Sequence, residues 1–153
     1  MKVMEIMSTD LQVCSPETTV ADAARLMWEA DCGILPVVDE GELVGVVTDR
    51  DMYIALATRQ ERASHLRIGA VATAPVVTCG PDDDVHVAMA TMRDVRVRRL
   101  PVVGRDNTLV GMLSMNDLLL ASGADPSVRA EDVVQTLRAI CRHRPPAPGL
   151  AAA

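Results

Sequence analysis

The chain of 153 residues is poor in aromatic side chains, with no Phe, one Trp and one Tyr. Its core must therefore be aliphatic, and nine Met side chains supply flexible packing. Few rings are available for stacking on bases, and the net charge is −6, which argues against a nucleic-acid partner. Hydrophobic residues make up 49% of the chain, enough for one compact domain or two small, closely packed halves.

Signals for export and for membrane insertion are also missing. Residues 1–10 lack the long apolar region of a signal peptide, and no apolar run approaches the roughly 20 residues that span a bilayer. The four cysteines show no C-x-x-C spacing, which is typical of a reducing compartment rather than a disulfide framework. We therefore predict a cytoplasmic location and no membrane partner.

Motifs of catalysis and metal binding are absent as well. There is no G-x-S-x-G elbow, no Walker-type loop, and no histidine beside a candidate nucleophile. Cys141 and His143 alone do not make a metal site. We predict no catalytic residue, no metal site and no required cofactor, although residues distant in sequence could still assemble a triad in space.

The main feature that is present is an internal repeat. Residues 35–38, LPVV, return 65 positions later as residues 100–103, and Cys14 and Met27 return as Cys79 and Met92. After one inserted residue in a turn, the offset becomes 66 and pairs the segments 43–51 and 109–117. Turns tolerate such insertions, so the pattern indicates a duplication.

Each repeat predicts the order β-α-β-β-α, an α/β (α+β) fold. Threonine and proline before an amphipathic stretch, and two valine-rich runs around a polar turn, are the helix and hairpin signals. A break over 122–126 precedes a further amphipathic helix. The predicted boundaries are repeat 1 over 1–57, a linker over 58–67, repeat 2 over 68–122, a C-terminal helix over 128–142 and a flexible tail over 143–153. Neither repeat could bury its apolar surface alone, so we expect two sheets packed about a pseudo-twofold axis.

Both hairpins end in a glycine, a hydroxyl residue and a carboxylate at the same spacing. These are Gly45, Thr48 and Asp51 in the first repeat and Gly111, Ser114 and Asp117 in the second. A strand that ends in a hydroxyl and opens a helix carrying a carboxylate could hold a phosphorylated, hydroxylated ligand. The carboxylates could instead be helix N-terminal acids that favour the helix dipole.

The repeated order, the LPVV strand and the closing pattern Gly-hydrophobic-x-Thr/Ser-x-x-Asp resemble the CBS-domain pair, or Bateman module, over residues 1–122. The resemblance implies a regulatory module that binds AMP, ADP, ATP or S-adenosylmethionine in a central cleft. It also implies a homodimer that stacks through the helices beginning at Asp49 and Met115. Any output would then pass to a separate effector protein, and the C-terminal helix could serve that purpose or extend the dimer.

The resemblance also assigns roles to individual residues. The hydroxyls of Thr48 and Ser114 and the adjacent helix N–H groups would hold phosphate, while Asp51 and Asp117 would accept hydrogen bonds from a ribose diol. The two glycines would let a base or sugar approach the backbone. Contacts to the base carry over to Thr19 and Ile34 in one repeat and to Asp84, Arg99 and Leu100 in the other.

The two half-sites differ in charge. Asp49 adds a negative charge beside Thr48, whereas Arg96, Arg98 and Arg99 precede the LPVV strand of the second repeat. We therefore predict that the Ser114–Asp117 site binds phosphate better. The arginines could instead form a solvated strand edge or salt bridges between subunits.

Three alternatives to this function remain open. The protein could be a ligand-free dimerisation scaffold. It could hydrolyse nucleotides with Asp51 or Asp117 activating water. A divalent metal such as Mg²⁺ could also bridge the ligand's phosphate and the acidic residues.

Overall fold

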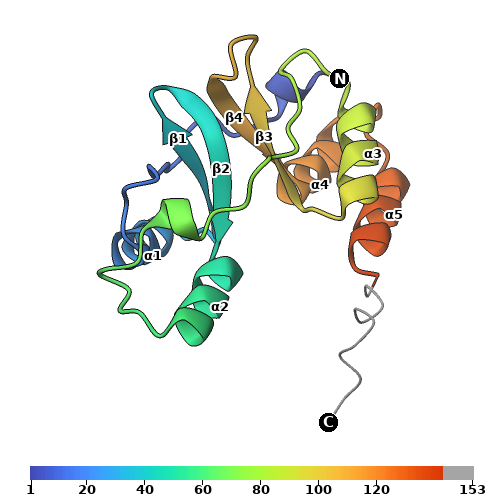
Figure 1. The fold of residues 1–153 in the computed structure, drawn as a ribbon. Coiled ribbons are helices and arrows are strands. Elements are labelled where there is room, and N and C mark those ends of the chain that lie inside the picture. Colours follow the sequence, from blue (N-terminus) through green and yellow to red (C-terminus); the bar gives the residue numbers. More distant parts are fainter. Residues whose placement is uncertain (143–153) are drawn as a thin grey trace.

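A computed structural model describes residues 1–142, and the predicted tail 143–153 lies outside them. Two antiparallel hairpins stand at the centre, with helices on either side (Figure 1). The elements in order are η1 (Val3–Glu5), α1 (Val20–Glu29), β1 (Ile34–Asp39), β2 (Glu42–Thr48), α2 (Asp49–Arg59), η2 (Ile68–Ala70), α3 (Val85–Val95), β3 (Arg99–Val103), β4 (Leu109–Ser114), α4 (Met115–Ala124) and α5 (Ala130–Ile140). The predicted α+β class is confirmed. The strand predicted at the start of each repeat is wrong, because Cys14 and Cys79 form only isolated bridges, with Val37 and Val102.

The helices begin where their capping residues predict. The side chain of Thr19 accepts a hydrogen bond from the backbone N–H of Asp22 at 3.1 Å and so caps α1. The break predicted over 122–126 begins later than expected, because α4 continues through Gly123 to Ala124 and α5 begins at Ala130. The helix ends at Asp125, whose backbone is extended, because the following Pro126 disfavours a helical conformation there.

The two hairpins have equivalent register and touch at their tips. Val37 pairs with Gly45 in the first, Val102 pairs with Gly111 in the second, and each register shifts at the next residue. Asn107 joins the hairpins: its side chain donates to the carbonyl of Leu43 at 2.9 Å, and its carbonyl accepts from the Leu43 N–H at 3.1 Å. The repeats are thus connected through main-chain groups as well as through packing.

The segment that leads into each repeat packs on the other repeat. The N–H of Val3 donates to Asp83 and the N–H of Ser8 donates to Met112, both in the second repeat. The N–H of Ile68 donates to Thr18 in the first repeat. Figure 1 shows η1 in blue beside β4 and α3, and the green turn of η2 beside α1 and β2.

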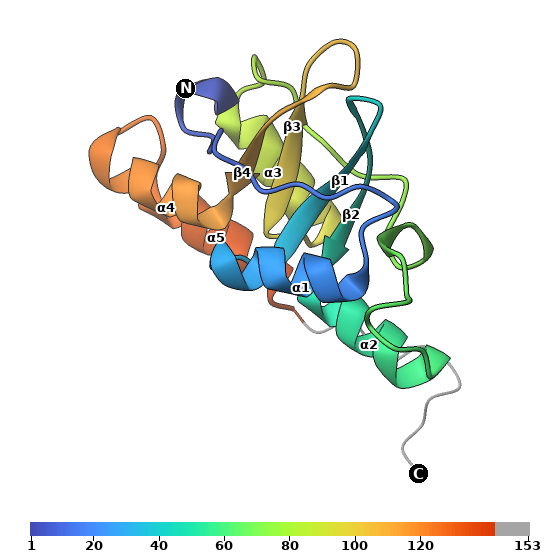
Figure 2. The ribbon, with the colours of Figure 1, turned by 90° about the vertical axis from the view of Figure 1, so that its left-hand side faces the viewer.

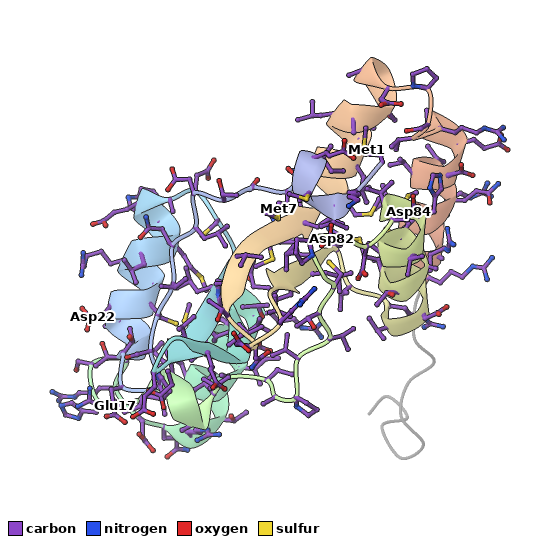
Figure 3. All side chains as sticks on the ribbon, turned by 90° about the horizontal axis from the view of Figure 1, so that it is seen from above. Met1, Met7, Glu17, Asp22, Asp82 and Asp84 are labelled. Carbon is purple, nitrogen blue, oxygen red and sulfur yellow. The ribbon has the colours of Figure 1, made fainter. Side chains whose placement is uncertain are left out.

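A charged contact also orients the N-terminal segment against the second repeat. Seen from above, Met1 and Met7 lie on the same side of the molecule as Asp82 and Asp84, far from α1 (Figure 3). The Lys2 ammonium lies 2.7 Å from Asp82, which raises the pKa of Lys2 and lowers the pKa of Asp82. Both groups are exposed, so this pair orients the segment more than it stabilises it.

Burial of hydrophobic side chains stabilises the exchanged arrangement of the leading segments. Val3 is completely buried in the core of the second repeat, and its counterpart Ile68 is completely buried in the core of the first. Leu66, within the predicted linker, is also buried in the first core. The packing units therefore differ from the sequence repeats, because each core takes a hydrophobic side chain from the segment before the other repeat.

Cys14 and Cys79 occupy equivalent positions in the two cores and are almost fully buried. Burial raises the pKa of both thiols to about 11, so they remain protonated at neutral pH. Both cysteines are therefore small core residues.

The last helix, α5, has no counterpart in the first repeat. It packs on α3 and α4, where it buries Val133 and Thr136. The guanidinium of Arg93 on α3 donates to the Thr136 hydroxyl at 3.1 Å. Within residues 1–142, every helix is too short or too polar to cross a lipid bilayer.

Gly111 provides a test of the exchanged packing. A Cβ atom at this position would lie 2.5 Å from Met7 Sδ and 3.1 Å from the Ser8 carbonyl oxygen. We expect Gly111→Val to lower the free energy of unfolding by about 1–3 kcal/mol, because overpacking would push the N-terminal segment away from β4. Chemical denaturation measures this loss.

The matched control is Gly123→Ala, because nothing lies within 4 Å of the Cβ position there. That variant should gain about 0.5–1 kcal/mol, since alanine favours the helix more than glycine does. Equal effects of the two substitutions would contradict the packing described here.

Candidate functional site

Two clefts of equivalent construction lie between the repeats. We name them the Thr48 cleft and the Ser114 cleft after the residue that caps the adjoining helix. Their volumes are about 680 and 440 Å³, within the range of small-molecule sites. Each cleft is lined by the end of one hairpin and by the segment between the helix and the first strand of the other repeat.

In the Thr48 cleft, the hairpin end meets the chain that connects α3 to β3. Thr48 and Asp51 form one wall, and residues 95–99 form the other. Thr73 and Pro75, from the segment leading into the second repeat, close a third side. Ile140 at the end of α5 also reaches this cleft.

In the Ser114 cleft, Ser114 and Asp117 face the end of α1 and the start of β1. Glu29 and Ile34 belong to that wall. The leading segment contributes Ser8 and Asp10, which correspond to Thr73 and Pro75 at the offset of 65. Both clefts therefore depend on the exchanged segments.

At the N-terminus of α2, the Thr48 hydroxyl and the Asp51 carboxylate are hydrogen-bonded to each other. Asp51 Oδ2 accepts hydrogen bonds from the Thr48 N–H at 3.0 Å and from the Thr48 hydroxyl at 2.7 Å. The Thr48 oxygen in turn accepts from the Asp51 N–H at 3.1 Å. This is a capping box, which satisfies donors that the helix itself leaves unpaired.

The second repeat has the same capping box. Asp117 Oδ2 accepts from the Ser114 N–H at 2.7 Å and from the Ser114 hydroxyl at 2.6 Å. Asp117 Oδ1 accepts only a long hydrogen bond of 3.4 Å from Ser8. In both repeats the capping box uses Oδ2, so Oδ1 is the oxygen that can receive a ligand hydroxyl.

Asp49 occupies the first turn of α2. Its Oδ1 accepts from the Arg50 N–H at 2.7 Å, while the Asp49 N–H donates to the carbonyl of Gly33 at 3.2 Å. These two N–H groups are therefore already paired. A phosphate in the Thr48 cleft would depend on side-chain cations rather than on this helix end.

The structure brings seven of the predicted site residues into the clefts. Thr48, Asp51 and Arg98 line the Thr48 cleft, Ser114 and Asp117 line the Ser114 cleft, and Ile34 and Arg99 line both. Each of these side chains is at least partly accessible.

The other five predicted residues line neither cleft. Leu100 is completely buried in the second core. Gly45 lies against Ala72 and Thr73, and Gly111 lies against Met7 and Ser8. The close approach of these exchanged segments, rather than of a base, accounts for the two glycines.

Thr19 and Asp84 are equivalent N-caps of α1 and α3, outside both clefts. The Asp84 carboxylate accepts from the His86 N–H at 2.8 Å, which is the main reason that the pKa of Asp84 is lowered. It also lies 3.7 Å from the N-terminal ammonium. Thr19 donates to Asp22 at 2.7 Å. Capping occupies both side chains.

Sequence reasoning missed the contribution of each repeat to the other repeat's cleft. Asp10 and Glu29 line the Ser114 cleft, and Val95 and Thr73 line the Thr48 cleft, although none of them belongs to the closing motif. The repeat offset offered a signal, because Ser8 and Thr73 are equivalent positions. Their membership of a site could be recognised only once the exchange was known.

The arginines also lie differently from the prediction. Arg96 and Arg98 line the Thr48 cleft and not the Ser114 cleft of their own repeat, whereas Arg99 lies between the two. The chain leaving α3 lines the Thr48 cleft, although Arg98 and Arg99 also line a smaller pocket beside Ser114 and Asn116. Arg96 does not line the Ser114 cleft, and the expectation that these charges favour phosphate there stays a prediction.

Among residues 1–142, no group of three or more His, Cys, Asp or Glu side chains could hold a metal ion. His143 lies outside the described residues.

The sequence of this chain matches a known family of domains. The sequence profile of the CBS domain matches residues 3–58 and 68–124. The chain is 34% identical over 116 residues to the CBS domain-containing protein YhcV of Bacillus subtilis, which covers 76% of this chain and 81% of YhcV.

Two similar structures have ligands bound. One is the CBS domain pair of protein MJ0100 in complex with 5′-methylthioadenosine and S-adenosyl-L-methionine, with a TM-score of 0.72 and 26% identity over 81% of this chain and 97% of that one. The other is CBSX2 of Arabidopsis thaliana in complex with AMP, with a TM-score of 0.71 and 28% identity over 80% of this chain and 96% of that one.

The capping role of Thr48 can be measured without a ligand. We expect Thr48→Ala to lower the free energy of unfolding by about 1 kcal/mol, because the start of α2 loses its cap. Thr48→Ser keeps the hydroxyl and should retain most of that stability. If Thr48→Ala unfolded like the unchanged protein in urea, the hydroxyl would not act as a cap.

Proposed function

Because the chain belongs to the CBS-domain family and carries two CBS domains in tandem, we propose that it is a regulatory module that binds adenosyl ligands between its repeats. The observation that carries this proposal is the construction of the clefts. In each one, a carboxylate that uses only one oxygen in its capping box lines the same cleft as residues supplied by the other repeat. A single ligand would therefore contact both repeats.

The ligand's ribose and base would use different parts of a cleft. A ribose hydroxyl would donate to Oδ1 of Asp51 or Asp117, where a hydrogen bond to a charged acceptor is stronger than a neutral one. Ile34 lines both clefts and provides an apolar surface for the base. The ligand-bound CBS pairs of similar fold support an adenosyl compound such as AMP, ADP, ATP or S-adenosylmethionine.

Regulation would follow from this bridging geometry. A ligand that touches both repeats favours the relative arrangement in which it binds most tightly, and only such a difference in affinity can shift the arrangement. The resulting signal would pass to a separate effector protein. We propose that binding, rather than catalysis, is the activity of this chain.

We also propose that the protein forms a homodimer through α2 and α4. The exposed apolar side chains there are repeated, since Tyr53 and Ile54 on α2 correspond to Leu119 and Leu120 on α4. Between 45% and 76% of each of these side chains is exposed. Figure 2 shows α4, α1 and α2 along one side of the molecule, and a duplicated face suits the two-fold contact of a homodimer.

The oxidation state of the cysteines is informative about the cellular compartment. All four are free thiols, two of them buried. Unpaired cysteines fit a reducing compartment, and we propose a cytoplasmic location.

Ligand binding can be tested by stability. Urea denaturation with AMP, ADP, ATP, 5′-methylthioadenosine or S-adenosylmethionine should raise the free energy of unfolding by about 2.7 kcal/mol at a ligand concentration 100 times the dissociation constant. GMP is the control for base selectivity. No shift with any adenosyl compound at millimolar concentration would favour the ligand-free scaffold.

The dimer can be tested in solution. We expect the double variant Tyr53→Glu/Leu120→Glu to shift the molar mass from dimer to monomer in light scattering, because each charge would have to be buried. The control is Val87→Asp on α3, an exposed apolar position whose counterpart is Asp22. A dimer that survived the double variant but not the control would contradict this interface.

A further inference from the structure

The two clefts share one construction but differ in charge. The ionisable residues that line the Thr48 cleft are Asp49, Arg50, Asp51, Arg96, Arg98 and Arg99. Those that line the Ser114 cleft are Asp10, Glu29, Asp117 and Arg99. Four arginines and two aspartates thus face one cleft, while three carboxylates and one arginine face the other.

We propose that the clefts select adenosyl ligands of opposite charge. The Thr48 cleft takes a 5′-phosphorylated adenosine, and the Ser114 cleft takes an adenosyl compound whose 5′ substituent is a cationic sulfonium. This inference rests on the proposed function and assigns a ligand class to each cleft.

The cations of the Thr48 cleft are available to a ligand. Within residues 1–142, neither Arg96 nor Arg98 nor Arg99 has a carboxylate partner within 4.0 Å. Arg98 makes one weak contact, 3.8 Å from Cys141 Sγ. Guanidinium groups bind phosphate through paired hydrogen bonds, so unpaired arginines around a cleft favour an anionic ligand.

The two carboxylates of the Thr48 cleft would repel a bound phosphate less strongly than two carboxylates without hydrogen bonds. Asp49 Oδ1 accepts from the Arg50 N–H at 2.7 Å, at the positive end of the α2 dipole. Asp51 Oδ2 is held by the two donors of Thr48. Hydrogen bonds thus compensate the negative charges of Asp49 and Asp51 locally. The positive charges of Arg96, Arg98 and Arg99 have no such partner.

The Ser114 cleft presents the reverse situation. The wall opposite Asp117 carries Glu29 and no cation, and the leading segment carries Asp10 where the other cleft has Pro75. Glu29 has one partner, Arg25, at 3.3 Å, and both side chains are more than half exposed. Asp10 has no salt bridge within residues 1–142. Repulsion would exclude a phosphate, whereas a sulfonium would be attracted.

Part of the difference comes from the segment that joins the helix to the first strand, which carries Arg96 and Arg98 in the second repeat. The equivalent positions Asp31 and Arg96 both adopt a left-handed backbone, with φ of 49° and 57°. The chain therefore takes the same local conformation at these two positions, where a basic residue in one repeat replaces an acidic residue in the other. Two residues further on, Gly33 in the first repeat corresponds to Arg98 in the second. The duplication thus keeps the arrangement of the elements, while the side chains that line the clefts differ.

Calorimetric titration of the full chain with AMP and with S-adenosylmethionine tests the proposal. Each ligand should bind one site per chain, and saturation with one should leave the affinity for the other within twofold. The double variant Arg96→Gln/Arg98→Gln should weaken AMP at least tenfold and leave S-adenosylmethionine within twofold. The matched control, Arg138→Gln, removes a charge from the exposed face of α5 outside both clefts.

The reciprocal variant Asp10→Asn/Glu29→Gln should weaken S-adenosylmethionine at least threefold and leave AMP within twofold. Circular dichroism establishes that each variant is folded. If AMP and S-adenosylmethionine competed for one site, or if the arginine variant left AMP binding unchanged, the charge assignment would be overturned while the proposed function stood. If neither ligand bound at millimolar concentration, both proposals would fail.

Discussion

The exchange of the leading segments is the constraint on which the rest of the structure depends. Val3 fills the core of the second repeat, Ile68 fills the core of the first, and both side chains are completely buried. Removing either segment would expose the apolar surface of the other repeat, so neither repeat has a complete core of its own. The same segments continue past η1 and η2 to line the clefts, which ties the geometry of each site to the packing of both cores.

The helix caps show how one set of residues serves stability and binding together. The carboxylates of Asp51 and Asp117 stabilise the first turns of α2 and α4 through one oxygen. Both carboxylates also line a cleft, and the cap fixes the position of the oxygen that it does not use. A ligand that used this oxygen would meet an acceptor already oriented by the fold, which reduces the entropy lost on binding.

The elements of the fold were largely readable from the chain because they depend on local patterns. Valine-rich runs around a polar turn predicted both hairpins, and Thr19 predicted the start of α1. The end of α4 was misplaced because Ser122 and Gly123 were given more weight than Pro126, which stops the helix. Of the candidate site, the motif residues Thr48, Asp51, Ser114 and Asp117 do line the clefts, whereas Thr19 and Asp84 are used in capping.

The duplication, the two hairpins and the two hydroxyl–carboxylate pairs could be read from the sequence alone, since all of these follow from spacing within a few tens of residues. Only the tertiary structure decided which repeat each leading segment completes and which cleft each arginine faces. Those outcomes depend on contacts between residues far apart in the chain, such as Ser8 with Met112. The equivalence of the two repeats also makes either pairing of segments consistent with the sequence pattern. Arg96 and Arg98 therefore line the cleft beside the hairpin of the other repeat because of packing between the repeats, which the local sequence spacing does not show.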